Sequence, residues 1–206
     1  MSTPPADAPS GTTVDTDGRR LRGERNKRAV VDALLALYEK GEVGPSAARV
    51  AELAGVSERS VFRYFDDMED LAATAIAVRY EQIRKFFLDL DTTGSFDERL
   101  AAIIDHRVRL YDRISPVARG SLVAATRSKT VAREVETRRA VLRKQAIDQF
   151  EHELIGLPDR KVAERVIDLA LSLDGIDYLL SSAGCSRPEL RASIARTIRD
   201  ALSAVD

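Results

Sequence analysis

The sequence predicts an all-α protein, and three observations lead to that class. Aliphatic residues repeat at helical spacing along most of the chain, and no segment alternates apolar with polar residues as a strand would. Aromatic residues make up only 5% of a composition that is 44% hydrophobic. A core of Leu, Ile, Val and Ala favours packed helices over sheets. We expect about nine helices in all, as an N-terminal three-helix unit followed by a larger C-terminal bundle.

The chain divides by composition into three parts. Residues 1–18 carry prolines, glycines and a run of Ser, Thr and Asp, with too little apolar surface to offset the ordering of the backbone. We therefore expect a disordered tail at 1–18. A first domain at 19–71 and a second domain at 72–206 follow it.

The first domain opens with a basic stretch and continues into three helices. Its first ten residues contain six basic side chains: Arg19, Arg20, Arg22, Arg25, Lys27 and Arg28. They form either the solvated start of a helix or an arm that lies on phosphates. Helical spacing then continues from Val30 to Tyr38. Ser46 opens a short helix to Leu53 and Ser57 opens another to about residue 64, because serine caps helix N-termini.

The second domain reads as longer helices separated by capping and breaking residues. Asp67 caps its first helix, and Gly156, Pro158 and Gly184 end later ones. We expect helices at 67–90, 96–114, from Pro116 onward, about 131–150, 159–183 and 188–204.

The two short helices have the spacing of a helix-turn-helix. Gly55 permits a tight turn between them, and Ala51 is small enough for the second helix to come close. Four apolar residues are spaced to fill the small core between the helices: Val50, Leu53, Val56 and Val61. In such a unit the second helix enters the major groove of DNA.

The polar face of the second short helix carries residues that suit base recognition. Arg59 and Arg63 lie four apart on one face, and the arginine fork matches the O6 and N7 acceptors of guanine. Ser60 can hydrogen-bond to a base or a phosphate. The candidate DNA contacts are Arg28, Ser46, Arg49, Ser57, Arg59, Ser60, Arg63 and Tyr64. The alternative is a structural helical hairpin with solvated arginines.

The stretch from Asn26 to Leu71 resembles the DNA-binding domain of the tetracycline-repressor (TetR) family. The matching segments are AVVDALLALYEKG, VAELAGVSERSVFRYF and DDMEDL. Relative to the family pattern, Phe62 replaces a Tyr and Met68 replaces a Lys, and both of those residues commonly contact the DNA backbone. Ser46 replaces a Thr. We therefore expect affinity to depend more on the basic arm, on Arg49 and on Arg63.

The resemblance implies a homodimeric, sequence-specific DNA-binding regulator with an unidentified small-molecule effector. By family tendency it is a repressor that the effector releases from a pseudo-palindromic operator in double-stranded DNA. The alternative is an activator or co-regulator whose C-terminal domain binds a protein partner. The resemblance also implies that later helices enclose the effector site and that the two C-terminal helices pair across a two-fold axis.

The apolar residues near the C-terminus independently favour a dimer. On the predicted 159–183 helix they cover an arc wider than one core face needs, so the helix must be buried on two sides. The last helix adds a second apolar stripe, which would give a four-helix interface. The candidate dimer residues are Val166, Leu169, Leu173, Leu180, Ile194 and Ile198.

The effector site is harder to predict than the DNA-binding site. The polar and aromatic candidates on the helical stripes are His106, Tyr111, Asp174 and Tyr178. Asp174 and Tyr178 are four apart and could hydrogen-bond to each other. The alternative for each is an ordinary core or edge residue. The aliphatic composition suggests an apolar, weakly basic or aromatic effector.

Several classes of protein do not fit the sequence. The histidines, His106 and His152, fall on different predicted helices, Cys185 is the sole cysteine, and no glycine-rich phosphate loop is present. We therefore expect no enzyme, no cofactor and no metal site. Without a membrane-spanning run or a signal peptide, a cytoplasmic location is expected. A net charge of −1 requires any DNA-binding charge to be local.

Overall fold

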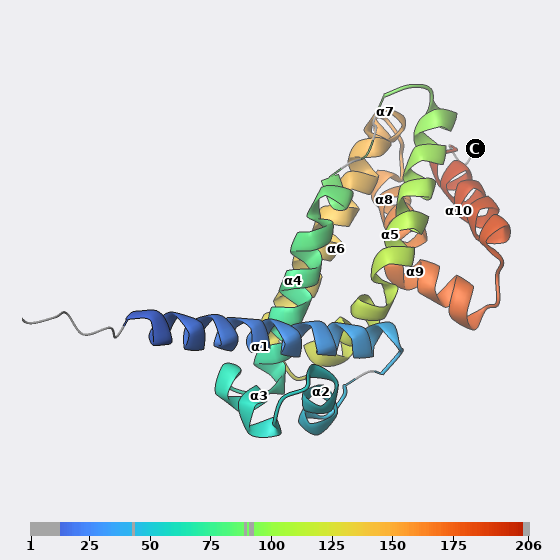
Figure 1. Cartoon of the computed structure of the whole chain (residues 1–206). Helices are drawn as coiled ribbons and strands as arrows, with labels where there is room; N and C mark the ends of the chain where they lie inside the picture. The colour runs from blue at the N-terminus through green and yellow to red at the C-terminus, as the bar shows by residue number, and fades with distance from the viewer. Residues whose placement is uncertain (1–12, 43, 89, 91–92, 204–206) are drawn as a thin grey trace, which may run out of the picture.

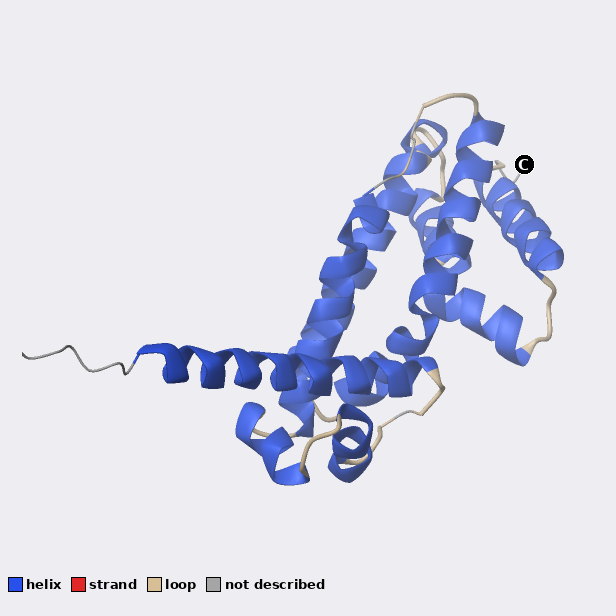
Figure 2. Cartoon of the chain, in the orientation of Figure 1, coloured by secondary structure: helices blue, strands red, loops and turns tan. Residues whose placement is uncertain are grey.

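The computed structural model describes residues 13–42, 44–88, 90 and 93–203, and these residues form helices and their connections, without a strand (Figure 2). The predicted all-α class is confirmed. In chain order the elements are α1 (Thr13–Glu39), α2 (Ala47–Ala54), α3 (Glu58–Tyr64), α4 (Met68–Leu88), α5 (Phe96–Ala125), α6 (Lys129–Gln149), α7 (Glu151–Leu154), α8 (Arg160–Leu171), α9 (Leu173–Asp177), the π-helix η1 (Tyr178–Ser182) and α10 (Arg187–Leu202).

Helices α1, α2 and α3 pack together at one end of the molecule, and α4 rises from them into the remaining helices (Figure 1). Leu34 and Leu37 of α1, Val50 of α2 and Val61 of α3 share one core, and each is at most 1% exposed. Both short helices expected from the serine caps are present. Each begins one residue after its capping serine.

Helix α1 begins earlier than the sequence predicted. Of the tail expected at 1–18, residues 1–12 lie outside the described residues and Thr13–Gly18 form the first turns of α1. The N-terminal half of this helix extends away from the other helices (Figure 1). A helix nucleated by packing can continue beyond its packed part, because each added residue gains one hydrogen bond. The basic stretch at 19–28 therefore lies on a projecting helix.

Helix α5 continues through Pro116, so the predicted break at this proline is wrong. A proline inside a helix removes one hydrogen bond and costs about 3 kcal/mol. Here the neighbouring side chains offset that cost by packing, since Ile114 and Val117 are fully buried in two different clusters. Four residues further on, Gly120 lies so close to the ring of Tyr38 that a Cβ would be 2.9 Å from it.

The predicted 159–183 helix is broken into three pieces. Ser172 is extended, with ψ at 148°, and its side chain accepts a hydrogen bond from the amide of Gly175 to cap α9. A side chain at Gly175 would collide with the carbonyl of Leu169, 2.6 Å from its Cβ position. The serine cap competes locally with helix continuation, and helical periodicity does not reveal such competition.

A second core joins α5, α6, α8 and α10. Its members include Ile103 and Ile104 of α5, Phe150, and two residues of the last helix that the sequence had assigned to a dimer interface, Ile194 and Ile198. These two are at most 1% exposed, so they stabilise this chain itself. Their assignment to an intersubunit surface is corrected, because the apolar stripe of α10 is buried against α8 and α5.

Candidate functional site

The two short helices form a compact helix-turn-helix whose second helix presents a polar outer face. Gly55 ends α2 with φ at 67°, the left-handed conformation, and its amide donates to the carbonyls of Ala51 and Glu52. Val61 of α3 points into the core, whereas Arg59 and Arg63 are exposed. This arrangement allows the outer face of α3 to approach a groove of DNA.

Arg59 and Arg63 differ in how they are held. Arg63 donates a 2.7 Å hydrogen bond to the Tyr64 hydroxyl, and its guanidinium lies 4.8 Å from the centre of that ring. Within the part of the chain that is described, Arg59 makes no ion pair or hydrogen bond through its side chain, so its five N–H donors are free for a ligand. Phe62 is 47% exposed between them, a large apolar side chain on a polar face.

The candidate serines also have a structural role. The hydroxyls of Ser46 and Ser57 each accept a 3.2 Å hydrogen bond from a backbone amide three residues later, that of Arg49 and that of Ser60. The hydroxyls of Ser57 and Ser60 also lie 2.9 Å apart. All three serines therefore order the helix N-termini, and each retains acceptor capacity for a further partner.

Two of the candidate arginines are already paired with carboxylates. Arg49 lies between Glu42 and Glu52, 2.8 Å from the latter, and hydrogen bonds to both raise its pKa above the ordinary value. Arg28 pairs with Asp32 at 3.3 Å. A phosphate that approached Arg49 would have to compete with these two carboxylates, and a role for Arg49 in DNA affinity stays a prediction.

The projecting half of α1 supplies a concentration of exposed positive charge. The arginines and lysine of the 19–28 stretch are all exposed. At its base the ammonium of Lys27 lies 5.4 Å from the centre of the Phe65 ring, directly after α3. The basic stretch of α1 therefore lies next to the C-terminal end of α3.

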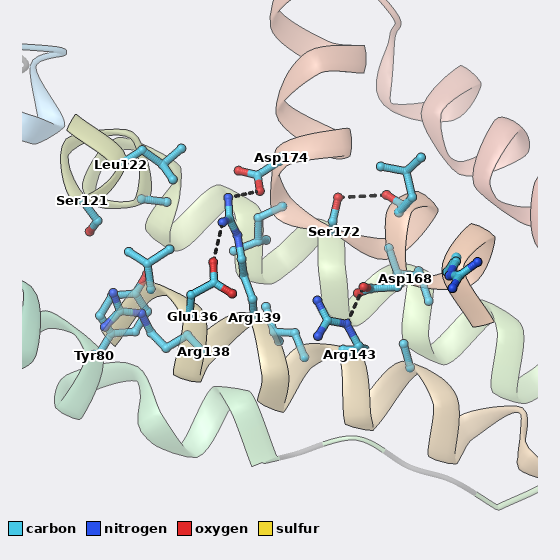
Figure 3. A pocket seen from close by; sticks show the side chains of 18 residues that line it. Tyr80, Ser121, Leu122, Glu136, Arg138, Arg139, Arg143, Asp168, Ser172 and Asp174 are labelled. Carbon is cyan, nitrogen blue, oxygen red and sulfur yellow. Dashed lines mark hydrogen bonds and ion pairs between the residues drawn. The ribbon is translucent and has the colours of Figure 1, made fainter. Parts of the chain in front are cut away.

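A cavity of about 530 Å³ lies between α4, α5, α6, α8 and α9, away from α2 and α3 (Figure 3). Its walls combine leucines and one valine with arginines, carboxylates and two serines. Arg139 of α6 donates to Glu136 and to Asp174 of α9, and Arg143 donates to Asp168 of α8. These ion pairs join α6 to the helices across the cavity.

Of the four predicted effector residues, Asp174 lines this cavity. His106 is buried beside Arg107, with 2.9 Å between its Nδ1 and the guanidinium. Tyr111 is buried and donates a 2.7 Å hydrogen bond to Asp177. Tyr178 is 63% exposed, and Asp174 pairs with Arg139 instead of with it. The structure therefore does not bring the four residues together.

Sequence reasoning missed Tyr80 and Arg138, which line the cavity side by side. The Arg138 guanidinium lies 3.5 Å from the centre of the Tyr80 ring, although the two residues are 58 positions apart and belong to α4 and α6. Burial raises the pKa of Tyr80 and lowers that of Arg138. In the sequence, Arg138 belongs to a charged run that is typical of a solvated helix face, so no local signal marked it.

The remaining dimer candidates lie on or near α8. Leu169 is 68% exposed, Val166 is partly exposed, and Val162 on the same side of the helix is 54% exposed. Leu173 and Leu180 are half-buried against the second core. An apolar stripe therefore remains uncovered along α8.

In the residues that the structure describes, no three His, Cys, Asp or Glu side chains are grouped to hold a metal ion. The described helices also lack any that is long and apolar enough to cross a bilayer.

Comparisons with known proteins identify the fold. No protein-family model and no curated protein matches the sequence. A transcriptional regulator from Rhodococcus sp. Rha1 matches with a TM-score of 0.63 and 19% identity over 87% of this chain and 95% of that one. A TetR-family transcriptional regulator from Streptomyces coelicolor matches with a TM-score of 0.63 and 18% identity over 86% of this chain and 80% of that one. A protein proposed to belong to that family, from Mesorhizobium loti MAFF303099, matches with a TM-score of 0.57 and 19% identity over 88% of this chain and 96% of that one. The predicted resemblance to the TetR family is confirmed at the level of the fold.

Proposed function

We propose that this chain is a DNA-binding transcriptional regulator of the TetR type, which acts as a homodimer and responds to a small molecule. The observation that carries the proposal is the outer face of α3. It presents the unpaired Arg59 and the stacked Arg63 on a short helix that a capped turn holds against α1 and α2. Arginines at this position of a helix-turn-helix read guanine in the major groove.

Selection of genomic DNA fragments by the purified protein tests this proposal. We expect enrichment of a palindromic site at moderate salt, and loss of enrichment in Arg59→Ala and Arg63→Ala. The matched control is Arg196→Ala, which removes an exposed arginine from α10. If the wild type enriches no site, or if the α3 variants enrich the same site as the control, DNA reading by this helix is refuted.

A homodimer would set two α3 helices about one DNA turn apart, ~34–36 Å. The uncovered stripe of Val162, Val166 and Leu169 on α8 supports such a dimer, because apolar side chains exposed in a row favour burial against a partner. The isologous contact of a two-fold dimer would pair this stripe with its own copy. A pseudo-palindromic operator follows from that symmetry.

The basic half of α1 would add phosphate interactions that do not depend on DNA sequence. A shortened chain that begins at Arg28 should bind DNA more weakly. The slope of log affinity against log salt should become shallower by about 0.9 for each phosphate that the arm neutralises in the full chain. Full affinity and an unchanged slope in the shortened chain would show that the arm is ordinary solvated surface.

Response to a small molecule is supported by the cavity and by its connection to the N-terminal core. Val135 of α6 lines the cavity and also belongs to the hydrophobic cluster in which α1 to α4 meet α5 and α6, and Tyr80 packs against the same cluster. A ligand that moves either residue would shift helices which carry α2 and α3. By family tendency the regulator is a repressor that its effector releases from the operator.

A protein partner is the second candidate for the C-terminal domain. It would be favoured by a filled helical core, whereas a cavity of about 530 Å³ is within the ~300–1,000 Å³ range of small-molecule sites. We therefore prefer a small molecule, and we propose no enzymatic activity.

A further inference from the structure

Two sets of side chains line the cavity, one aliphatic and one charged, and most of the charged ones are labelled in Figure 3. The apolar part is formed by aliphatic side chains that include Leu122, Val135, Leu142, Leu171 and Leu173. The charged part contains four arginines and three carboxylates: Arg138, Arg139, Arg143, Arg165, Glu136, Asp168 and Asp174. A ligand that fills the cavity must therefore suit both an apolar wall and a set of charges.

All three lining carboxylates are already satisfied by arginines. Arg139 bonds Glu136 at 2.9 Å and Asp174 at 2.6 Å, and Arg143 bonds Asp168 at 2.6 Å. A cationic ligand would have to displace one of these arginines to reach a carboxylate. The acidic residues therefore give little attraction to a cation.

Two lining arginines have no carboxylate at hydrogen-bonding distance. The Arg138 side chain is only 14% exposed, and its nearest carboxylate, that of Glu134, is 3.8 Å away. Its Nη2 is buried without a hydrogen-bond partner among the described residues. Arg165 is exposed at the α8 wall, and the described part of the chain offers its side chain no ion pair.

A third arginine, Arg107, lies behind the α6 wall of the cavity. It is fully buried, and its Nη2 donates a 2.8 Å hydrogen bond to the carbonyl of Leu142, which lines the cavity. The side chains of Gln145 and His106 also lie within hydrogen-bonding distance of it, and no ion pair within 4 Å joins Arg107 to a carboxylate of the described residues. Burial lowers the pKa of Arg107 to about 10, which reflects a cation held in apolar surroundings.

We propose that the cavity binds an organic anion, a molecule with an apolar body and a carboxylate or similar group directed at Arg138. The inference rests on the proposed function and names the chemical class of its effector. A buried cation is costly unless it is closely paired, and the carboxylate partner of Arg138, that of Glu134, is 3.8 Å away, so a bound anion would add a closer counter-charge. This class differs from the apolar, weakly basic or aromatic effector that composition suggested, because each lining carboxylate is already paired with an arginine and offers a basic group little attraction.

Calorimetric titration with three ligands that share one body tests the charge preference. The probes are 4-phenylbenzoate, 4-phenylbenzyl alcohol and 4-phenylbenzylamine, which are anionic, neutral and cationic at pH 7. We expect the full chain to bind the acid at least about tenfold more tightly than the alcohol, the scale of one hydrogen bond to a charged group, and the amine most weakly.

Variants identify which arginine provides the preference. In Arg138→Met, which keeps an apolar side chain against Tyr80, the acid should lose its advantage over the alcohol while the alcohol still binds. Should that variant fold poorly, Arg165→Gln is the second test, because this exposed residue can be changed without disturbing the core. We expect the affinity for the acid to fall several-fold in this variant. Arg196→Gln removes the same net charge from α10 and should change nothing.

Equal binding of acid and alcohol, tighter binding of the amine, or no binding of any probe would overturn the assignment. DNA selection by the same wild-type protein separates this inference from the function on which it rests. A protein that selects an operator but shows no preference for the acid keeps the regulator function and loses the anion. A protein that prefers the acid but selects no DNA keeps the anion-binding cavity and loses the regulator function.

Discussion

Replacing Gly55 by alanine tests whether the turn between α2 and α3 depends on backbone conformation alone. Gly55 has φ at 67°, and a Cβ added there would meet no atom within 4 Å. The left-handed conformation costs an L residue about 1–2 kcal/mol, and reduced freedom of the unfolded chain returns about 0.4–1 kcal/mol. We therefore expect the free energy of unfolding to fall by about 1 kcal/mol.

Thermal unfolding followed by far-UV circular dichroism measures this change. For a chain of 206 residues, about 1 kcal/mol corresponds to a decrease in Tm of about 2–4 °C. Gly55→Asn is the matched control, because asparagine tolerates the left-handed region, and it should lose less than half as much. An alanine variant that melts at or above the wild-type temperature would refute the reasoning. So would an asparagine variant that loses as much as the alanine variant, since the cause would then be steric.

Three further predictions concern packing, charge and assembly. In Gly120→Ala the new methyl would lie 2.9 Å from the buried ring of Tyr38. We expect this overpacking to lower the free energy of unfolding, measured by chemical denaturation, by about 1–3 kcal/mol. An unchanged denaturation midpoint would contradict the close approach. Burial raises the pKa of Asp177, but hydrogen bonds led by that from Arg119 outweigh it and hold the pKa below its usual value. The stabilisation by the charged Asp177 is therefore present above about pH 3.9 and is lost as the pH falls through the lowered pKa. Asp177→Asn should lower Tm at pH 7 by an amount that shrinks in acid. A difference in Tm between variant and wild type that persists in acid would show a role other than charge. Val162→Glu should weaken the proposed dimer at least about 30-fold in analytical ultracentrifugation, because a carboxylate would be buried, whereas Val141→Glu on α6 should leave it intact.

Local signals predicted the N-terminal unit well. Ser46 and Ser57 cap the two short helices, Gly55 makes the turn, and the apolar spacing identified Val50 and Val61 as core residues. Leu53, which the same spacing predicts for this core, is instead 40% exposed. Each of these features acts within a few residues, so it can be read from a short stretch of sequence. The all-α class followed for the same reason, since helical periodicity is local.

The breaks in the longer helices could not be predicted in this way. Pro116 does not end α5, because packing of its neighbours against two cores outweighs the missing hydrogen bond. Ser172 does end α8, although the apolar periodicity continues beyond it. In both cases a local preference competes with tertiary packing, and the sequence does not reveal which is stronger.

By itself, the sequence determined the helix-turn-helix, the polar face of α3 with Arg59 and Arg63, and the basic stretch at 19–28. Only the tertiary structure decided which residues distant in the sequence come into contact. It buried Ile194 and Ile198 in the chain's own core and brought Tyr80 against Arg138 to form a cavity wall. The physical reason is that capping and periodicity act between near neighbours in the chain, whereas the charge and shape of a cavity depend on which distant helices meet.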